Sequence, residues 1–517
     1  MEPAELGGVG TAVGALERRA DADPDAELVR FEDGTRVGVG ELDAGSRAVA
    51  ARLAERAEPG ASVATCLVPG RDAVELVFGL ARLGVAEVPL PLDVTAASAR
   101  ALLVATGART LVVGAEALAG NERLAELVTV IPDVVVVGAG APKELPLLDE
   151  LPLRPGAAAR RPPPEPGAPL AVLSTSGTTG RAKAAVLPHF AAVRHAQRVR
   201  ATMGYRPGDV LFNVFPWNHI NVRHAALLPA LLSGARLVAH RRFSASGFWA
   251  TCRAEGVTAF NFMGAMLAIL DRRPPAPEDA AHRVRLAYGA PAPVDLARRF
   301  LDRFGVRALE AYACTELGDV AANTPDTWRP GTAGRVVPEY EVAILDEAGR
   351  PLPPGEVGQI AARPRLPHMA FLEYAGDPDA TSSVRPDGWF RTGDRGRLDA
   401  DGYLSFAGRR ADVVRRRGEN VAAWDVERVL VEMPGVLDAA VVGVASELTE
   451  QEILAVLTPA GGADLTGPAV RDWCRPRLPP HALPRFVRIV PELPRNPNGK
   501  VLKAALGLDP DTWDAGR

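Results

Sequence analysis

One glycine-rich segment combines residue types that could bind phosphate. Residues 174–183 read Ser-Thr-Ser-Gly-Thr-Thr-Gly-Arg-Ala-Lys and follow a short apolar run that predicts a strand. Glycines let backbone N–H groups approach phosphate oxygens, hydroxyls donate further hydrogen bonds, and Lys183 can neutralise charge. The segment is not a Walker A loop, because Ala182 and Ala184 flank the lysine. A flexible polar surface loop is the alternative, since Gly/Ser/Thr loops are common.

Further along the chain, other groups suit a magnesium-bound nucleotide. Tyr312 could stack on a purine, Thr315 could bond a phosphate, and Glu316 could hold Mg²⁺. Asp394 ends the run Gly-Trp-Phe-Arg-Thr-Gly-Asp, and its two oxygens could accept both hydroxyls of a ribose. Each segment also has a structural alternative, namely a helix cap at Thr315, a turn with an exposed Asp394, and an Asn-Gly turn before a solvated Lys500.

In this order and spacing, the segments resemble motifs of the adenylate-forming superfamily, which includes acyl-CoA synthetases, peptide-synthetase adenylation domains and firefly luciferase. The resemblance extends from roughly Phe31 to Leu506 and rests on six motifs, at residues 174–183, 288–291, 310–316, 388–394, 408–412 and 494–501. The sequence departs from the family pattern at Ala182, Ala184, Ala313, Arg417 and Asn498. The hydroxyl and glycine part of the first motif is intact, so phosphate binding is expected to survive.

The resemblance implies a set of site residues. The ATP-binding residues would be Thr175, Ser176, Gly177, Thr178, Thr179, Gly180, Lys183, Gly289, Ala290, Pro291, Tyr312, Asp394 and Arg409. The catalytic residues would be Lys500, Thr315 and Glu316, and Glu316 would also hold Mg²⁺. The acyl pocket would be lined by Trp217, Asn218, His219, Asn261 and Gly264. Gly264 stands where a proline is common, which would widen the pocket.

The implied reaction is the ATP-dependent activation of an organic acid as its acyl-adenylate, with release of pyrophosphate. The acyl group would then pass to the thiol of coenzyme A, so that ATP, Mg²⁺ and coenzyme A are the expected cofactors and co-substrate. Within the superfamily, the sequence most resembles the fatty-acid and carnitine-type CoA ligases. Departures near the phosphates leave a second hypothesis open, in which the second substrate is not coenzyme A. The acceptor would be an amine or a carrier-protein thiol, or the enzyme would activate nitrite for diazotisation or N–N bond formation. A third hypothesis is an inactive nucleotide-binding homologue, and the retained Lys500, Asp394, Glu316 and Arg409 argue against it.

The sequence says less about the acid. The segment Phe215–His219 lacks the Phe-Asp pattern that grips an ammonium group in peptide-synthetase domains, which disfavours an α-amino acid. Arg223 and His224 could serve a second acidic group on the substrate, but a buried structural network is the favoured interpretation.

These groups must be positioned by an α/β fold. Short apolar runs alternate with helical patterns before residue 340, which predicts parallel α/β layers. Residues 340–406 predict a small antiparallel, barrel-like unit, and a mobile α+β domain is expected over residues 409–517 after an N-terminal domain over residues 1–408. The proline-rich stretch from Leu151 to Pro169 predicts a surface linker without helix or central strand.

Composition excludes several classes of protein. The 517 residues carry a net charge of -4, which gives no sign of a nucleic-acid partner. The arginines at positions 415–417 form only a local run, which could meet the phosphates of coenzyme A or be solvated. The four cysteines are far apart, which argues against a disulfide framework or a zinc site. No apolar run is long enough to span a membrane and no secretory signal opens the chain, so a cytoplasmic location is expected.

Overall fold

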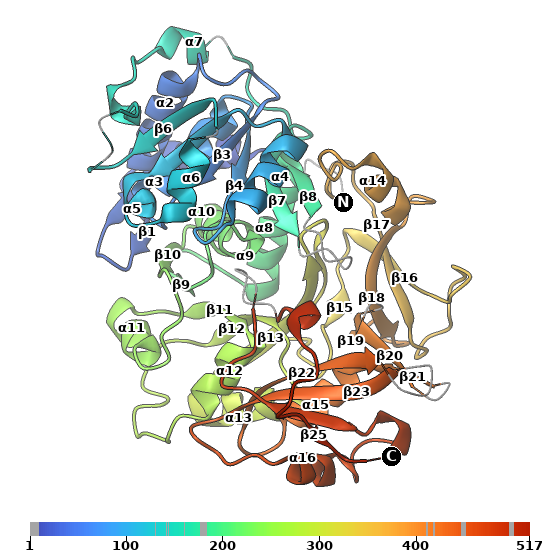
Figure 1. The fold of residues 1–517 in the computed structure, drawn as a ribbon. Coiled ribbons are helices and arrows are strands. Elements are labelled where there is room, and N and C mark those ends of the chain that lie inside the picture. Colours follow the sequence, from blue (N-terminus) through green and yellow to red (C-terminus); the bar gives the residue numbers. More distant parts are fainter. Residues whose placement is uncertain are drawn as a thin grey trace.

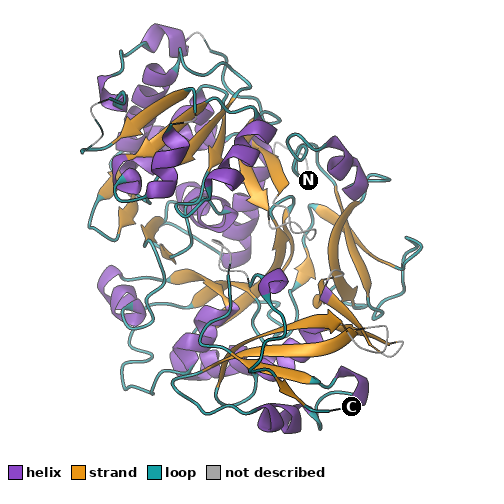
Figure 2. Cartoon of the chain, viewed as in Figure 1, coloured by secondary structure: helices purple, strands orange, loops and turns teal. Residues whose placement is uncertain are grey.

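A computed structural model describes residues 10–129, 131–140, 142, 144–159, 161–175, 183–409, 412–416, 419–445, 451–495 and 501–516. The fold is mixed α/β, as predicted, and its described strands form five sheets. Figure 1 shows the first α/β lobe at one end of the molecule and the C-terminal strands at the other. Figure 2 shows helices packed around the strands of the first lobe.

The first lobe contains a six-stranded sheet. Valine-rich runs such as Asp133–Val137 are almost wholly buried, as expected of parallel strands covered on both faces. All neighbouring strands are parallel except the last pair, β7 and β8. The spatial order is β6 (Asp133–Val137), β5 (Thr110–Gly114), β3 (Ser62–Cys66), β4 (Ala86–Pro89), β7 (Pro169–Thr175) and β8 (Lys183–Pro188). The helices in this part of the chain are α2 (Val39–Leu53), α3 (Arg71–Arg82), α4 (Ala96–Thr106), α5 (Ala115–Leu118), α6 (Glu122–Val128), α7 (Pro155–Ala159) and the 3₁₀ turn Leu148–Glu150.

A nine-stranded sheet forms the middle of the molecule. Its central strands are parallel, whereas its two edges are antiparallel. The spatial order is β15 (Arg335–Val336), β14 (Gly318–Ala322), β13 (Arg307–Cys314), β12 (Leu286–Ala290), β11 (Ala259–Met263), β9 (Val210–Asn213), β10 (Arg236–Ala239), β1 (Glu27–Phe31) and β2 (Arg36–Gly38). The accompanying helices are α1 (Ala12–Ala22), α8 (His189–Met203), α9 (Ile220–Val222), a π-helical turn (Arg223–Leu227), α10 (Leu228–Ser233), α11 (Phe248–Glu255), α12 (Gly264–Asp271) and α13 (Val294–Phe304).

An antiparallel unit follows the nine-stranded sheet, and the bounds 340–406 expected for it stay a prediction. Its four strands lie in the order β16 (Tyr340–Leu345), β17 (Gly358–Pro364), β18 (Phe390–Leu398) and β19 (Leu404–Arg409), with the short helix α14 (Pro378–Val384) before β18. An isolated bridge between Arg335 and Tyr403 connects β15 with the start of β19. This bridge fixes the unit against the edge of the nine-stranded sheet.

The C-terminal region has a hydrophobic core of its own. That core runs from Val414 to Val487 and includes the fully buried Leu430, Ile453 and Cys474. Its elements are β20 (Val413–Arg416), β21 (Glu419–Ala422), α15 (Ala423–Val431), β22 (Val436–Ala445), β23 (Gln451–Pro459), α16 (Gly467–Cys474), β24 (Phe486–Ile489), β25 (Trp513–Asp514) and the 3₁₀ turns Pro480–Ala482 and Lys503–Ala505. The domain boundary between residues 408 and 409 stays a prediction.

The prediction of a helix-free linker from Leu151 to Pro169 is wrong in one respect. Helix α7 begins at Pro155, because proline is tolerated in the first turn, where its missing N–H has no helical partner. The backbone of Arg154 donates to Ala51 in helix α2, so this stretch is fixed along that helix.

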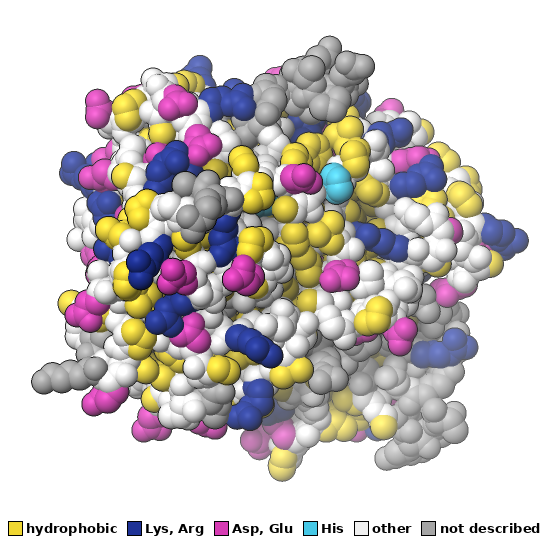
Figure 3. Space-filling view, turned by 90° about the horizontal axis from the view of Figure 1, so that it is seen from above, with side chains coloured by type: hydrophobic (Ala, Val, Ile, Leu, Met, Phe, Trp, Pro, Cys, Tyr) yellow, Lys and Arg dark blue, Asp and Glu magenta, His cyan; other side chains and the backbone are white. Residues whose placement is uncertain are grey.

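Charged side chains of both signs are interspersed over the face shown in Figure 3. All four cysteines are free, and three of them are buried. Within the described part of the chain, none of the helices combines the length and apolarity needed to cross a membrane.

Candidate active site

A cavity of about 1240 Å³ lies where the strands β11, β12 and β13 end. These strands are parallel, and ligands of α/β sheets bind outside the carboxyl ends of such strands. Of the residues expected in the site, those that line this cavity are Gly289, Ala290, Pro291, Thr315, His219 and Gly264. The chain therefore brings the 288–291 and 310–316 motifs and the expected acyl-pocket residues His219 and Gly264 to one sheet edge.

Two glycines allow the loops at this edge to approach each other closely. A Cβ atom on Gly289 would lie 2.0 Å from the carbonyl oxygen of Phe262, and one on Gly264 would lie 2.7 Å from that of Pro291. Any side chain at either position would force the two backbones apart. Gly264 thus lies against the 289–291 loop. A larger residue at position 264 would displace this loop as well as narrow the pocket.

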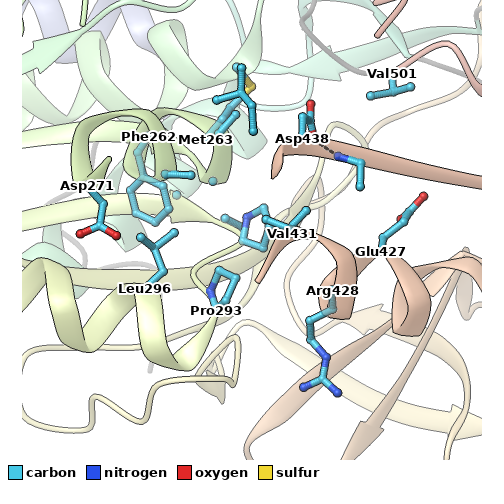
Figure 4. Close-up of a pocket in the computed structure, with 18 of the residues that line it drawn as sticks. Phe262, Met263, Asp271, Pro293, Leu296, Glu427, Arg428, Val431, Asp438 and Val501 are labelled. Atoms are coloured by element: carbon cyan, nitrogen blue, oxygen red, sulfur yellow. Dashed lines mark hydrogen bonds between the residues drawn. The ribbon is translucent and has the colours of Figure 1, made fainter. Parts of the chain in front are cut away.

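The C-terminal region forms the opposite wall of the cavity. Figure 4 shows Phe262 and Met263 on one side and Val431, Asp438 and Val501 on the other. The indole ring of Trp424, on α15, meets the ring of Phe406, on β19, edge to face at 5.3 Å. The cavity therefore lies between the larger part of the chain and its C-terminal region.

One cluster joins β13 to the antiparallel unit. The hydroxyl of Tyr312 donates to Oδ2 of Asp394 at 2.7 Å, and Nε of Arg409 lies 3.5 Å from Oδ1. Asp394 and Arg409 are directly paired across strands β18 and β19. Burial and then the Asp394 carboxylate raise the pKa of Tyr312 well above its usual value, so its hydroxyl remains a donor. Asp394 thus contacts two other expected ATP-binding residues, Tyr312 and Arg409.

A second cluster contains a residue that sequence reasoning missed. The hydroxyl of Tyr374 donates to Oε1 of Glu316 at 2.6 Å, and the Lys183 ammonium lies 4.7 Å from the centre of the same ring. Burial and then Glu316 raise the pKa of Tyr374, which keeps the phenol protonated. The loop that carries Tyr374 lies beside Lys183 because Tyr374 forms a β-bridge with Ala185, on the same strand as Lys183. No sequence motif marks Tyr374.

Several expected residues lie outside the described residues: Ser176, Gly177, Thr178, Thr179, Gly180 and Lys500. Thr175 and Lys183, which flank the first group, are paired across β7 and β8. Arg495 and Val501, which flank the second, form an antiparallel bridge, and both line the main cavity.

The expected acyl-pocket residues divide into two groups. His219 and Gly264 line the cavity, whereas Trp217, Asn218 and Asn261 are not among its lining residues. The amide of Asn261, which is 1% exposed, donates to Asn221 at 2.8 Å and to the carbonyl of Ala225 at 3.1 Å. Asn221 and Ala225 are themselves lining residues, so Asn261 supports this wall from behind.

Arg223 takes part in a buried structural network. Its guanidinium group forms two hydrogen bonds with Glu87, at 2.5 and 2.9 Å, and a third with the carbonyl of Trp217 at 2.6 Å. Thr65 donates to the same carboxylate at 2.6 Å. Burial, with His195 and Arg223 nearby, lowers the pKa of His224 well below its usual value, so His224 is neutral. These contacts favour the structural interpretation of both residues over a role in binding a second acidic group.

Comparisons with known proteins agree with this arrangement. Residues 16–369 match the AMP-binding enzyme family, and residues 425–500 match the AMP-binding enzyme C-terminal domain. The sequence is 34% identical over 340 residues to a crotonobetaine/carnitine–CoA ligase of Salmonella paratyphi A, an alignment that covers 65% of this chain and 66% of the relative, just under two thirds.

Two solved structures are similar over almost the whole chain. The ATP-bound MatB of Rhodopseudomonas palustris superposes with a TM-score of 0.82 at 26% identity, over 95% of this chain and 97% of that one. The amide bond synthetase McbA of Marinactinospora thermotolerans gives a TM-score of 0.81 at 26% identity, over 95% and 98%. With a family match that covers more than half of its length, the chain belongs to the AMP-binding enzymes.

Proposed function

We propose that this protein activates an organic acid with ATP as an acyl-adenylate and then transfers the acyl group to the thiol of coenzyme A. The observation that carries the proposal is that the 310–316 segment joins three groups of expected residues. Its Thr315 lines the same cavity as the 289–291 loop, its Tyr312 contacts Asp394 in the cluster with Arg409, and its Glu316 contacts Tyr374 in the cluster with Lys183. Apart from Tyr374, these are residues that the adenylating motifs assign to ATP or to Mg²⁺. Membership of the AMP-binding enzymes supports the same reaction.

The first step needs little acid–base chemistry and much electrostatic stabilisation. A carboxylate oxygen of the acid attacks the α-phosphorus of ATP, the bond to the bridging oxygen of the β-phosphate breaks, and pyrophosphate leaves. Both reactants are anions, so the site must supply positive charge and fixed dipoles. We assign this role to Lys183, Lys500, Thr175 and the 176–180 segment, with Thr315 on the α-phosphate.

The nucleoside would be held by the remaining residues. The 289–291 loop and Tyr312 would bind the adenine, Asp394 would accept hydrogen bonds from the ribose hydroxyls, and Arg409 would contact ribose and phosphate. A side-chain carboxylate can accept two such bonds at once. Gly289 keeps this loop against strand β11, because a Cβ there would lie 2.0 Å from the carbonyl oxygen of Phe262.

Glu316 is a suitable partner for magnesium. Tyr374 occupies Oε1, and the second oxygen of the carboxylate could bind the ion. Among the described residues, no group of three or more His, Cys, Asp or Glu side chains could form a metal site by itself. That fits Mg²⁺, which proteins commonly hold through one or two carboxylates together with substrate phosphates. When bound, the ion would offset the charge of the phosphates.

In the second step the sulfur of coenzyme A attacks the acyl carbon, the bond to the AMP oxygen breaks, and AMP leaves with its electron pair. Coenzyme A is proposed as the acceptor because the Salmonella relative is a CoA ligase. We further propose that residues 409–517 form a domain that rotates between the two steps, since they contain a separate core. A cytoplasmic location remains a prediction.

Pyrophosphate release tests the proposal. The purified chain is incubated with ATP, Mg²⁺ and a panel of carboxylic acids, with and without coenzyme A, and the products are identified by mass spectrometry. We expect release that requires an acid, and an acyl-CoA product when coenzyme A is present. Pyrophosphate release that does not depend on coenzyme A, together with amide products when amines are added, would show that the acceptor is an amine and not coenzyme A. No release with any acid would contradict adenylation.

A further inference from the structure

A side-chain amide at the cavity wall is held in one orientation. Asn221 lies on the short helix α9 and lines the main cavity. Its Oδ1 accepts a hydrogen bond from Nδ2 of Asn213, on β9, at 2.9 Å, and another from Nδ2 of Asn261, on β11, at 2.8 Å. Both donor residues are 1% exposed. The oxygen of Asn221 therefore faces the buried side of the wall.

The backbone determines the orientation of the two donors. Oδ1 of Asn213 accepts from the backbone N–H of Phe215 at 2.9 Å, and Nδ2 of Asn261 also donates to the carbonyl of Ala225 at 3.1 Å. Since an N–H needs an acceptor and a carbonyl needs a donor, both amides present their nitrogen to Asn221. If the Asn221 amide were turned over, three NH₂ groups would face one another. The backbone thus decides which end of Asn221 faces the protein.

The nitrogen of Asn221 is accessible from the cavity. Within the part of the chain that the structure describes, Nδ2 has no hydrogen-bond partner, and unlike Oδ1 of Asn261 it is not a buried atom. Asn221 is partly exposed and lines the cavity, whereas its oxygen is turned toward buried residues. The exposed surface of Nδ2 therefore faces the cavity, and both of its hydrogens are available to a ligand there.

Strand β11 separates this amide from the loop that we assign to adenine. Asn221 is bonded to β9 and β11, whereas the 289–291 loop begins at the end of β12. In the sheet, β11 lies between β9 and β12 and pairs with both. With the nucleotide on the β12 side, a ligand group beside Asn221 belongs to the acid.

The surroundings of this nitrogen favour an uncharged partner. Ile220 and Phe262, which adjoin Asn221 and Asn261 in the chain, line the cavity and are apolar. Nδ1 of His219 accepts from the backbone N–H of Asn221 at 3.1 Å, and an imidazole that accepts at one nitrogen carries no positive charge. The arginines that line the cavity lie directly after α12, on α13 or in the C-terminal region. A carboxylate beside Nδ2 would be costly to bury without a cation from the same wall.

We propose that Nδ2 of Asn221 determines substrate specificity by donating a hydrogen bond to an uncharged carbonyl oxygen of the acid, away from its reacting carboxylate. An amide N–H donates and does not accept, so it favours a carbonyl over an alkyl group of the same shape. The substrate class is thus an organic acid with a ketone or amide carbonyl. The inference rests on the proposed adenylation, because it concerns the acid which that reaction activates.

The test compares acids of nearly equal shape in the pyrophosphate assay. The pairs are 4-oxopentanoate with 4-methylpentanoate and 4-acetylbenzoate with 4-isopropylbenzoate. We expect the wild-type chain to prefer the carbonyl acid of at least one pair by about tenfold or more in kcat/KM, since a site built around a hydrogen bond rejects analogues that cannot form it. It should also prefer 4-oxopentanoate to butanedioate, which has a charged oxygen in place of the methyl group.

Asn221→Asp removes the donor and keeps the acceptor of the network. One carboxylate oxygen can still accept from Asn213 and Asn261, whereas the other faces the cavity and cannot donate at about pH 8, where an aspartate is ionised. We expect the ratio between the paired acids to fall to about one, chiefly because KM for the carbonyl acid rises. Calorimetric titration of both acids with the α,β-methylene analogue of ATP present gives the ratio of Kd values without relying on turnover.

Asn323→Asp is the matched control for this substitution. Asn323 is also 1% exposed, and its Nδ2 donates to the carbonyls of Glu310 and Thr332 at 3.0 and 2.7 Å, but it does not line the main cavity. The same change there removes two buried hydrogen bonds, so it should lower thermal stability. The ratio between the paired acids should stay as in wild type.

The outcomes are separable. A wild-type chain that shows no preference in either pair, or that prefers butanedioate to 4-oxopentanoate, overturns the carbonyl assignment while leaving adenylation intact. The role of Nδ2 is overturned if Asn221→Asp keeps the wild-type ratio, or if Asn323→Asp loses the ratio equally. Absence of acid-dependent pyrophosphate release from the wild-type chain contradicts the proposed function itself.

Discussion

The hydroxyl of Tyr374 donates a 2.6 Å hydrogen bond to the carboxylate of Glu316, and its ring lies 4.7 Å from the ammonium of Lys183. Tyr374 thus contacts both the proposed magnesium ligand and a lysine proposed to bind phosphate. Tyr374→Phe keeps the ring under Lys183 but removes the hydrogen bond to the carboxylate. We expect kcat/KM for ATP to fall about tenfold, because a hydrogen bond to a charged group contributes about 1.5–3 kcal/mol. Steady-state kinetics with saturating acid measures the change.

Tyr403→Phe is the matched control for that variant. The Tyr403 hydroxyl donates to the carbonyl of Thr327 at 3.1 Å, in the antiparallel unit, and the residue does not line the main cavity. It should lose stability of about 1 kcal/mol and keep its kinetics. Equal kinetic losses in the two variants would mean that Tyr374 has only a structural role.

The contact between Tyr312 and Asp394 predicts unequal effects of two substitutions. Asp394→Ala removes the proposed acceptor of the ribose hydroxyls, so the Kd for ATP should rise about 100-fold. Tyr312→Phe removes only the 2.7 Å bond that orients this carboxylate, and we expect a rise of about three- to tenfold. Calorimetric titration with ATP distinguishes the two. A larger effect at Tyr312 than at Asp394 would show that the carboxylate does not bind the ribose.

The buried pair of Arg223 and Glu87 predicts a loss of stability. Replacing Arg223 by Met leaves Glu87, whose side chain is 3% exposed, as an uncompensated buried charge. The free energy of unfolding should fall by about 3–5 kcal/mol, and the double variant with Glu87→Gln should recover part of that loss. Urea unfolding measures both. If Arg223→Met is as stable as wild type but fails with a diacid substrate, the residue serves the substrate instead.

Short-range patterns were enough to predict much of the fold. The alternation of apolar runs and helical patterns predicted parallel layers, and the structure contains these layers together with an antiparallel sheet and a C-terminal α+β region. The residues Tyr312, Asp394 and Arg409 could be selected because each lies in a motif. The contact of Asp394 with Arg409 depends on the pairing of β18 with β19, which no local pattern specifies.

Contacts between distant segments were not predictable in this way. Tyr374 lies in a loop without a motif. The bridge to Ala185 and the backbone hydrogen bond from Phe371 to the carbonyl of Glu316 bring this loop to Glu316. Packing also determines which residues line the cavity and which support its wall. Asn261 does not line the cavity but donates a hydrogen bond to Asn221, which does. Helix α7 was missed because the proline content of its segment outweighed the fact that a proline can begin a helix.

Glu310 predicts a dependence of stability on pH. Burial raises its pKa from the ordinary 4.5 to about 7, although the backbone N–H of Ala292 donates to it at 2.9 Å. Between these pH values the folded chain binds more protons than the unfolded chain, so the free energy of unfolding falls as the pH rises. At about 1.4 kcal/mol for each pKa unit, the loss is roughly 3 kcal/mol and is complete above pH 7.

Glu310→Gln isolates this effect, because its amide does not titrate. Denaturant unfolding of both chains from pH 5 to pH 8, a range of about three units around the expected transition, should show wild-type stability falling relative to the variant. Parallel curves for the two chains would mean that Glu310 ionises in the folded protein as it does in water.

Lys500 provides the most direct test of the proposed chemistry. A lysine that bridges the acid and the α-phosphate acts mainly in the transition state, so Lys500→Ala should reduce adenylate formation by about 1000-fold or more while changing the Kd for ATP only about threefold. Single-turnover formation of the acyl-adenylate and ATP titration measure the two quantities. Lys503→Ala is the control, because the Lys503 ammonium pairs with Asp412 at 2.9 Å and with Glu427 at 2.8 Å. That variant should lose stability but still form the adenylate, whereas wild-type turnover in Lys500→Ala would remove residue 500 from the mechanism.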